Sequence, residues 1–410
     1  SSVCHCGKEE RLIQRVPHYY KAFHCIASDC RDNCCVGGWE IDIDEETAQY
    51  YLSMEGEFGD RLRNSITRTD EYCFRLKDGK CPFLDSKGLC EIYQVLGEDK
   101  MGVVCTQFPR YTEYYGAVKE TGIGLACEEA ARIICQDKEA FTFNEETISE
   151  EEVSDAEFDA PLAKQLFSVR SQIFEMLTDT KMSLEDKLIL LLEVCHQLQE
   201  AVNVNDTAAC AWIAQSSYTE WGKFTDTDTP KQQKDRQANV PQTAQSDSVD
   251  VDRQDGLERI LYAYDALEVL NEDWNRQKEE LFSVLHGEDF SAQAYRDSFA
   301  RFKRSVQERE REYINLTAYF VFRYFMKAAY DHDVYGKAQL ITANYLVLQE
   351  MDFLRWIQNG EKYGFKDRME LIHIFSREVE YSEENLEDLA EEFLFDDIFE
   401  KEQLCALLKG

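Results

Sequence analysis

The sequence contains little glycine and even less proline, with 19 and 6 residues in a chain of 410. Turn-rich β proteins use more of both, so this scarcity favours long helices and a mainly α fold. A chain of this length can bury two or three hydrophobic cores. We therefore expect a small N-terminal domain followed by a larger helical domain.

Basic clusters and long apolar runs are also lacking. The formal net charge of −35 and the lack of a Lys/Arg stripe argue against a nucleic-acid partner, because phosphate binding needs a basic surface. No run approaches the ~18 apolar residues of a membrane span, and the polar segment from Ser1 to Val16 lacks the apolar core of a secretory signal. We expect a cytoplasmic protein with no nucleic-acid and no membrane partner. Its acidic surfaces are typical of solvated helix faces and would also attract a lysine-bearing partner.

Cysteine, by contrast, is abundant, and 12 of the 15 cysteines fall within the first 135 residues. Thiolates are soft donors, and about four of them bind zinc or an iron–sulfur cluster. In a reducing compartment such a set indicates metal binding or redox chemistry rather than disulfides. The sequence predicts a cysteine-rich metal-binding domain over residues 17–140. The expected metal ligands form two groups along the chain, Cys25, Cys30, Cys34 and Cys35, then Cys81, Cys90, Cys105 and Cys127.

The spacing of these cysteines does not choose between zinc and iron. It matches neither the two CxxC knuckles of a zinc ribbon nor a bacterial ferredoxin run, and Gly37 stands where the CxxxCxxC motif of radical enzymes has its third cysteine. A helix through CRDNCC would place Cys30 and Cys34 on one face. The neighbouring Cys35 would then serve a second centre or pack. The segment CPFLDSKGLC predicts a turn around Asp85 to Gly88.

The remaining cysteines fit other roles. Cys73, Cys135 and Cys195 lie in apolar contexts and are expected in the core. Cys4 and Cys6 belong to a polar leader that we expect to form a mobile tail.

Helical periodicity dominates beyond the cysteines. After an acidic, exposed linker from Asn144 to Asp159, we expect a helical region over residues 160–224, where Ser183 and Asp186 form a capping box that opens a helix reaching Leu198. Residues 225–256 contain no Leu, Ile, Phe, Tyr, Trp or Met and predict a flexible loop. A second helical domain follows over residues 257–410. It contains long helical patterns at 257–285, 292–330 and 337–357, and then an acidic surface helix at 378–408 whose inward residues include Leu386, Leu389, Phe393 and Leu394.

The order PHYYKAFHC, CRDNCCVGGWEIDID, CPFLDSKGLCEIY, LGEDKMGVVCTQFPR and LACEEAARII resembles the flagellin lysine-N-methylase family. The block from CRDNCC to CTQFPR is also similar to a broader group of cysteine-rich proteins described as zinc- or iron-chelating domains. The resemblance covers residues 17 to about 135, and the helical remainder is similar only in character. One departure is the sequence ACEE around Cys127, where the family has serine-cysteine-proline-glutamate. It keeps the cysteine and leaves the local turn open.

This resemblance implies a 4Fe–4S cluster and the transfer of methyl groups from S-adenosylmethionine to lysine ε-amines of flagellin, in a bacterial cytoplasm. By analogy with other iron–sulfur enzymes, an open iron would chelate the amino and carboxylate groups of the methionine moiety. Three cysteines rather than four would then bind the cluster.

Methyl transfer to lysine requires a deprotonated and oriented amine. A carboxylate or a tyrosinate can take its proton, so we name Asp42, Asp44 and Tyr93 as candidate catalytic residues. Trp39, like Tyr93, would form an aromatic wall around the sulfonium through cation–π contact. Arg110 would hold the carboxylate of S-adenosylmethionine with two hydrogen bonds. Trp39 and Arg110 are thus the candidate cofactor-binding residues.

Simpler explanations of the same residues stay open. The alternation in GWEIDID fits a half-buried strand, Trp39 and Tyr93 fit core packing, and Arg110 fits a structural ion pair. Gly122 and Gly124 lack the strand–loop–helix context of a dinucleotide-binding fingerprint. Two alternative functions also remain, a non-catalytic adaptor held together by zinc or iron and a redox or iron-handling protein.

Overall fold

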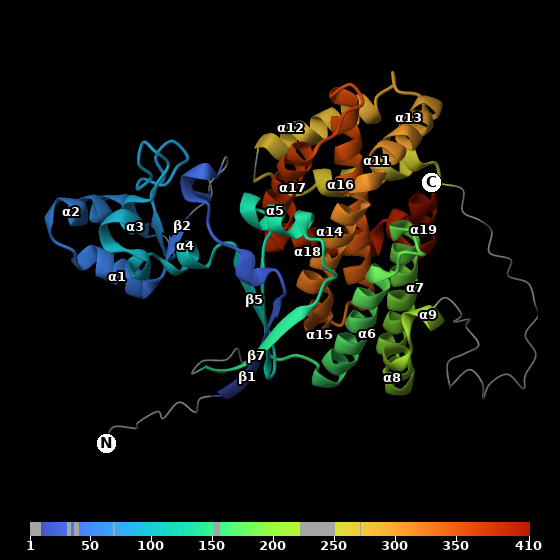
Figure 1. Ribbon diagram of the computed structural model, residues 1–410, viewed down its shortest axis with the longest axis horizontal. Helices are drawn as coiled ribbons and strands as arrows, with labels where there is room; N and C mark the ends of the chain where they lie inside the picture. The colour runs from blue at the N-terminus through green and yellow to red at the C-terminus, as the bar shows by residue number, and fades with distance from the viewer. Residues whose placement is uncertain are drawn as a thin grey trace, which may run out of the picture.

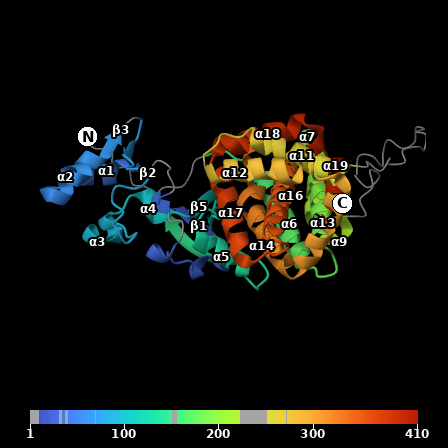
Figure 2. The ribbon, with the colours of Figure 1, turned by 90° about the horizontal axis from the view of Figure 1, so that it is seen from above.

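The computed structural model of the chain describes residues 10–30, 34–36, 41–68, 70–150, 156–221, 251–270 and 272–410. A small N-terminal lobe, a four-stranded sheet and a large helical body follow one another along the longest axis of the molecule (Figure 1). The view from above shows the same separation of the small lobe from the helical body (Figure 2). The described residues form two hydrophobic cores. One lies in the small lobe, and the other lies in the helical body and includes residues of the adjoining sheet.

The small lobe surrounds a three-stranded sheet with the strand order β2–β4–β3. Its elements are β2 (Ile41–Ile43), α1 (Glu45–Ser53), α2 (Gly56–Ser65), β3 (Ile66–Arg68), β4 (Tyr72–Phe74), α3 (Glu91–Leu96) and α4 (Val103–Gln107). Its core includes Ile41, Ile43, Tyr51, Leu62, Phe74 and Phe83. Cys81, Cys90 and Cys105 pack against the edge of this core, which brings three of the predicted metal ligands to one small hydrophobic unit.

The four-stranded sheet connects the lobe to the body. Its strand order is β5 (Arg110–Tyr115), β6 (Val118–Ile123), β1 (Glu10–Pro17) and β7 (Phe143–Glu150). The pair β1–β6 is parallel, whereas β5–β6 and β1–β7 are antiparallel. The guanidinium of Arg170 donates to the Glu120 carboxylate of β6 at 2.8 Å, and both side chains are buried. This ion pair fixes the sheet to helix α6 (Ala160–Thr178) of the body.

The helical body contains the remaining helices. They are α5 (Glu128–Gln136), α6 (Ala160–Thr178), α7 (Leu184–Asn203), α8 (Thr207–Gln215), α9 (Tyr218–Trp221), α11 (Arg253–Asp265), α12 (Glu272–Glu280), α13 (Ala292–Ser305), α14 (Glu310–Tyr324), α15 (Ala328–Asp331), α16 (Val334–Gln358), α17 (Phe365–Val379), α18 (Glu383–Phe395) and α19 (Lys401–Lys409). A π-helical turn, Leu281–Leu285, follows α12. Helix α16 lies in the middle of the body (Figure 2) and is buried on nearly every side, as its apolar sequence requires.

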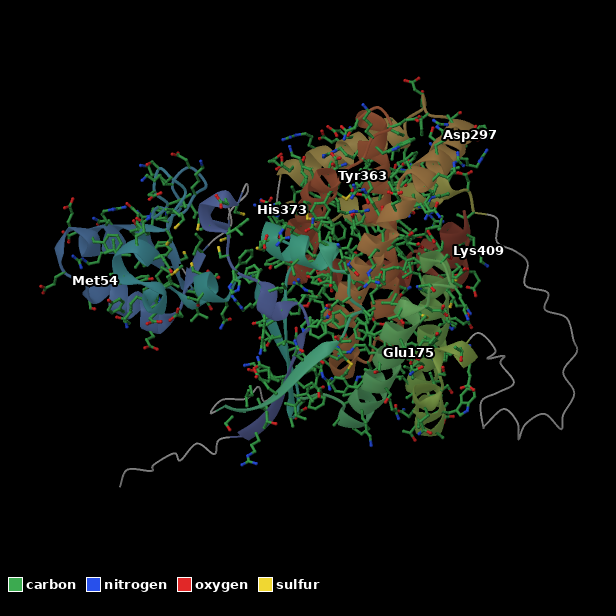
Figure 3. The ribbon with its side chains drawn as sticks, in the orientation of Figure 1. Met54, Glu175, Asp297, Tyr363, His373 and Lys409 are labelled. Carbon is green, nitrogen blue, oxygen red and sulfur yellow. The ribbon has the colours of Figure 1, made fainter. Side chains whose placement is uncertain are left out.

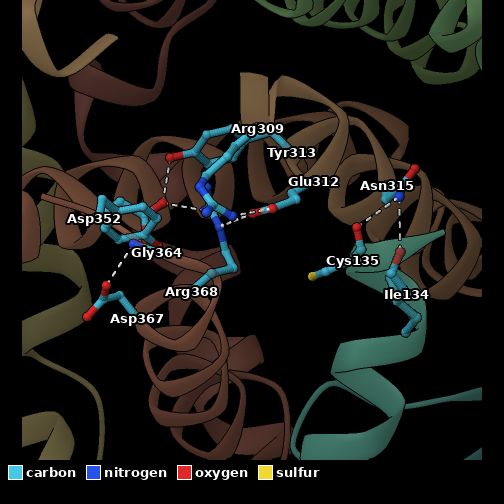
Figure 4. A network of polar contacts seen from close by, with 11 residues as sticks. Ile134, Cys135, Arg309, Glu312, Tyr313, Asn315, Asp352, Gly364, Asp367 and Arg368 are labelled. Carbon is cyan, nitrogen blue, oxygen red and sulfur yellow. Dashed lines mark hydrogen bonds and ion pairs between the residues drawn. The ribbon is translucent and has the colours of Figure 1, made fainter. Parts of the chain in front are cut away.

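A buried polar network joins α14, α16 and α17. The guanidinium of Arg368 contacts the carboxylates of Asp352 and Glu312, and the Tyr313 hydroxyl donates to Asp352 (Figure 4). Arg368 and Asp352 are at most 1 % exposed, so each charge depends on the other for its solvation. In the same region the Asn315 amide donates to the Ile134 carbonyl at 3.0 Å, which fastens the C-terminal part of α5 to α14.

Several local predictions are confirmed. Helices dominate the structure, as expected for a mainly α fold. Ser183 is the N-cap of α7, and its hydroxyl oxygen accepts a hydrogen bond from the Asp186 N–H at 3.1 Å. The predicted helix at 337–357 corresponds to α16. Strand β2 has the expected alternation, with Ile41 and Ile43 buried and Asp42 exposed.

Other predictions are wrong in identifiable ways. Most of the acidic stretch at 144–150 is exposed but is not a linker, because it forms strand β7 and pairs with β1. The loop predicted for 225–256 ends early, since α11 begins at Arg253, and residues 225–250 lie outside the described part of the chain. Two long helical patterns are interrupted, at 266–270 between α11 and α12 and at 306–309 between α13 and α14. Leu394 is 77 % exposed rather than inward.

The described helices include none with both the length and the apolar character needed to cross a bilayer.

Candidate functional site

The turn predicted in CPFLDSKGLC positions two cysteines at the surface of the small lobe. The Asp85 carboxylate accepts hydrogen bonds from the N–H groups of Lys87 and Leu89, at 2.8 and 2.9 Å. Such side-chain-to-backbone bonds stabilise a tight loop. A β-bridge pairs Leu84 with Cys90, so Cys81 and Cys90 lie at the two ends of the same loop.

The central contact of the site joins this loop to the segment that carries Cys34 and Cys35. The backbone N–H of Cys81 donates to the carbonyl of Cys35 at 2.8 Å. The thiol of Cys35 is also hydrogen-bonded to the thiols of Cys34 and Cys81, and these bonds raise the pKa of Cys35. The hydrogen bond from Cys35 lowers the pKa of Cys81 despite its burial. A thiol that loses its proton readily is a better metal ligand.

Two further thiols belong to the same face. Cys90 is the N-cap of α3, and Cys105 lies in α4. Burial raises the pKa of Cys105 to about 12, and negative charge on Cys81, Cys34 and Cys90 adds to this rise. Burial also raises the pKa of Cys90, and the charges of Cys81 and Cys34 contribute to this rise. These mutual effects place the five half-buried thiols of the lobe near one another.

Three cysteines lie on the side of the site that belongs to the sheet and the body. Cys25 is exposed, Cys30 is half-buried, and Cys127 is the N-cap of α5. The Cys30 thiol donates to the Glu128 carboxylate at 3.8 Å. Burial raises the pKa of Cys127 to about 11, and the charges of Cys34 and Cys25 contribute to the rise. Cys34 thus lies within electrostatic range of both sets of thiols.

The structure therefore brings the eight predicted ligands to one region. It divides them into five thiols of the lobe and three on the side of the sheet and the body, and not into the two groups of four that follow one another along the chain. We call this region the thiol face, consisting of Cys25, Cys30, Cys34, Cys35, Cys81, Cys90, Cys105 and Cys127. Sulfur atoms gather on the side of the small lobe that faces the body (Figure 3). Cys30 has an extended backbone, so no helix through CRDNCC begins at this residue. Residues 31–33 lie outside the described segments.

The donor chemistry of the thiol face fits a soft metal, but its arrangement is not a closed coordination site. No group of three or more His, Cys, Asp or Glu side chains in the described residues is placed to hold a metal ion. The structure thus contains the cysteine-rich lobe that the sequence predicts. Metal binding by that lobe stays a prediction. No disulfide joins the described cysteines, and Cys73, Cys135 and Cys195 are buried as expected.

The two candidate bases differ in their surroundings. Asp42 is exposed on the polar side of β2. Asp44 is the N-cap of α1, where it accepts from the Thr47 N–H, and its second oxygen accepts from the Val103 N–H, both at 3.0 Å. Burial alone would raise the pKa of Asp44, but these N–H groups hold it below its ordinary value. Asp44 thus fastens α1 to α4, and a carboxylate so stabilised is a weak base.

The other candidate site residues are Tyr93, Trp39 and Arg110, and the structure describes two of them. Tyr93 is 53 % exposed on α3, so core packing is the wrong explanation for it. Trp39 lies outside the described residues. Arg110 is exposed at the start of β5, with its guanidinium carbon 5.2 Å from the ring centre of Phe23. No carboxylate pairs with Arg110 in the described part of the chain, so the structural ion pair is not found.

A buried polar cluster beside Cys127 was missed by the sequence prediction. The hydroxyls of Tyr319 and Tyr324 donate to the Glu380 carboxylate at 2.9 and 2.8 Å, and the Arg323 guanidinium lies 3.4 Å from the same oxygen. Burial raises the pKa of the adjacent Tyr381, and the charges of Glu380, Cys127 and Cys34 contribute to the rise. Tyr381 thus lies within electrostatic range of both the cluster and the thiol face. No motif signals it, because its members come from α14 and the end of α17.

This cluster explains Gly124, which directly follows β6, and Tyr111 explains Gly122 within the strand. A Cβ atom at Gly124 would lie 2.7 Å from the Tyr381 hydroxyl and 3.1 Å from the Arg323 guanidinium. Gly122 lies opposite Tyr111 in the β5–β6 pair, and the Tyr111 ring fills its space. These glycines serve close packing and not dinucleotide binding.

The structure shows the local conformation at residue 128, where this sequence departs from the family pattern. Glu128 is the first residue of α5, directly after the N-cap Cys127. Proline is favoured at this helix position as well, so the exchange is compatible with the same turn.

Comparison with known proteins gives the family. Residues 170–407, more than half of the chain, match the family described as FliB lysine N-methylase C-terminal domain. The chain belongs to this family. The match covers the helical body, so the prediction that this part is similar only in character was wrong.

Individual relatives agree with the family match. The lysine-N-methylases of Salmonella typhimurium (strain LT2) and Salmonella choleraesuis (strain SC-B67) are each 26 % identical over 200 residues, covering 47 % of this chain and 49 % of each relative. The flagellar biosynthetic protein FliU of Salmonella muenchen is 28 % identical over 141 residues, covering 32 % of this chain and 80 % of FliU. The chain thus spans about half the length of the two lysine-N-methylases. No solved structure matches.

Proposed function

We propose that the chain is a protein-lysine N-methyltransferase that uses S-adenosylmethionine and acts on surface lysines of flagellin in the cytoplasm. The observation that carries the proposal is that the thiol face adjoins the FliB-type body, because Cys127 is the N-cap of α5 and the Asn315 amide fastens α5 to α14 of that body. The printed names of the relatives, lysine-N-methylase and flagellar biosynthetic protein, support the reaction and the flagellar substrate.

The thiol face is the proposed cofactor site. Half-buried thiols that influence one another's pKa suit a 4Fe–4S cluster, with zinc as the alternative metal. When bound, the cluster would supply a Lewis-acidic iron for the amino and carboxylate groups of the methionine moiety, and S-adenosylmethionine would supply the electrophilic methyl group. Cys34, Cys35 and Cys81 are the first ligands we assign, because the Cys35 thiol is hydrogen-bonded to the other two thiols.

The remaining residues would bind and orient the reactants. The Arg110 guanidinium, which has no carboxylate partner in the described residues, would pair with the methionine carboxylate. Its position over Phe23 and Tyr20 would restrict its orientation. As the new N–C bond forms and the S–C bond breaks, the lysine nitrogen must give up a proton. Asp42 is the better candidate to accept it, because Asp44 is held by two backbone N–H groups.

The test is methyl transfer by anaerobically purified protein. Flagellin is incubated with isotopically labelled S-adenosylmethionine, and methylated lysines are located by mass spectrometry. Labelled methyl-lysine that depends on both the chain and S-adenosylmethionine supports the proposal. Unlabelled flagellin, obtained with protein that carries its full metal content, contradicts it.

A further inference from the structure

A cavity of about 350 Å³ lies between α12, α16 and α17 and extends to α5. Its wall on α5 is Glu128, whose carboxylate accepts the hydrogen bond from Cys30. Glu128 therefore links the cavity to Cys30 of the thiol face. His373, another lining residue, lies on the side of the body that faces the small lobe (Figure 3).

The cavity has an apolar floor and a charged rim. Met369 and Ile374 form part of its wall and are 4 % and 8 % exposed. Asp273, Arg276 and Glu370 are exposed at its edge. A floor and rim of this kind suit a long aliphatic side chain that ends in a charge.

The net charge of the residues that line the cavity favours a positively charged ligand. Four carboxylates and two guanidinium groups line the cavity, which leaves an excess of negative charge. Arg276 pairs with Asp273 at 3.2 Å, and Arg355 pairs with Glu370 at 3.2 Å. Glu280 accepts a hydrogen bond from the neutral Gln358 amide at 2.9 Å, and no cation pairs with it in the described residues. Glu280 is therefore suited to receive a cation from outside.

An independent observation points to a ligand with a hydrogen-bond acceptor. Gln277 lines the same cavity and is 4 % exposed, and its amide nitrogen has no hydrogen-bond partner in the described structure. A buried donor without an acceptor opposes folding, and a ligand that supplies an acceptor would remove this penalty. A peptide carbonyl is an acceptor of the right kind.

We infer that this cavity anchors a lysine side chain of the protein substrate. The aliphatic stem would pack on Met369 and Ile374, the ammonium group would bind Glu280, and a peptide carbonyl would accept from Gln277. The inference rests on the proposed function, since a lysine-bearing protein is the proposed substrate. A carboxylate favours the protonated amine, which is not a nucleophile. The anchored lysine is therefore not the one that is methylated, and the cavity selects which segment of the substrate is presented.

A peptide-binding assay with the full chain tests the inference. Two fluorescein-labelled peptides of glycine and serine carry either one central lysine or one acetyl-lysine, and fluorescence anisotropy gives both dissociation constants. The lysine peptide is expected to bind about tenfold more tightly. Glu280→Gln should remove this preference. The matched control is Glu279→Gln, which removes the same charge from the exposed neighbouring position of α12 and should keep the preference.

A second variant separates binding from folding. Gln277→Met should weaken the binding of both peptides without lowering the midpoint of thermal unfolding, because it removes a buried donor that lacks a partner. Equal affinity of the wild-type chain for both peptides would overturn the inference, and so would a lysine preference that survives Glu280→Gln.

Kinetics with flagellin distinguish this inference from the proposed function. Glu280→Gln should raise the KM for flagellin and leave kcat and the KM for S-adenosylmethionine unchanged. Normal methylation by this variant with an unchanged KM would overturn the inference alone. If the wild-type chain transfers no methyl group but prefers the lysine peptide, the proposed function fails and the lysine site stands.

Discussion

Cys35 and Cys81 are joined twice, by a backbone hydrogen bond of 2.8 Å and by a hydrogen bond between their thiols. They are separated along the chain by β2, β3 and β4, so the fold of the small lobe creates this contact. The double connection holds the two thiols in a fixed relation at the edge of the lobe's hydrophobic core. We take this contact as the centre of the proposed metal site.

Replacing Cys81 by serine should remove most of the bound metal and abolish methyl transfer, because the hydroxyl is a far poorer ligand for soft metals. Metal analysis and the methylation assay measure both effects. Cys195→Ala is the matched control, since Cys195 is buried in the helical body. It should cost about 1 kcal/mol of stability and keep the metal and the activity. Full metal content in Cys81→Ser would exclude Cys81 as a ligand.

Arg110→Gln should weaken the binding of S-adenosylmethionine about tenfold, since it removes a charged hydrogen bond to the carboxylate. Isothermal titration calorimetry measures the affinity. Methylthioadenosine lacks the amino-acid moiety and serves as the control ligand, whose affinity should not change. A parallel loss of affinity for both ligands would show that Arg110 acts on the shape of the site and not on the carboxylate.

Asp44→Ala should destabilise the small lobe by about 1–2 kcal/mol, because the caps on α1 and α4 are lost together. Urea unfolding across a pH series measures the effect. The pKa of Asp44 is lower in the folded chain, so its stabilisation is complete above the unfolded-state pKa of about 3.9 and is lost as the pH falls through the folded-state value. The difference between wild type and variant should shrink on acidification, and a difference that grows there would contradict the capping role.

Arg368→Met should lower the free energy of unfolding by about 3–5 kcal/mol, because it leaves the buried carboxylate of Asp352 without its cation. Arg301→Met provides the comparison, since Arg301 and Glu361 form an exposed pair at 3.0 Å. That exchange should cost no more than about 1 kcal/mol. Equal losses in the two variants would show that the Arg368 network does not stabilise the body.

The parts of this structure that were predictable from the sequence depend on local patterns. The cap at Ser183, the alternation of Ile41, Asp42 and Ile43, and the turn at Asp85 follow from residues close together in the chain. Local spacing determines such features, because a helix or a turn satisfies its hydrogen bonds within a few residues.

The features that were missed depend on contacts between distant segments. Strand β7 was mistaken for a linker because its acidic sequence becomes a strand only through pairing with β1. The contact of Cys35 with Cys81 and the cluster of Tyr319, Arg323 and Glu380 likewise arise from tertiary packing. Resemblance to a family supplied the reaction, whereas spacing alone did not identify the metal.

The most direct test of the proposed metal site is the metal content of anaerobically purified wild-type protein, measured as iron, sulfide and zinc together with a visible spectrum. We expect brown protein with roughly four irons and four sulfides per chain. Colourless protein with stoichiometric zinc and no sulfide would contradict the iron–sulfur site and favour a zinc-bound lobe.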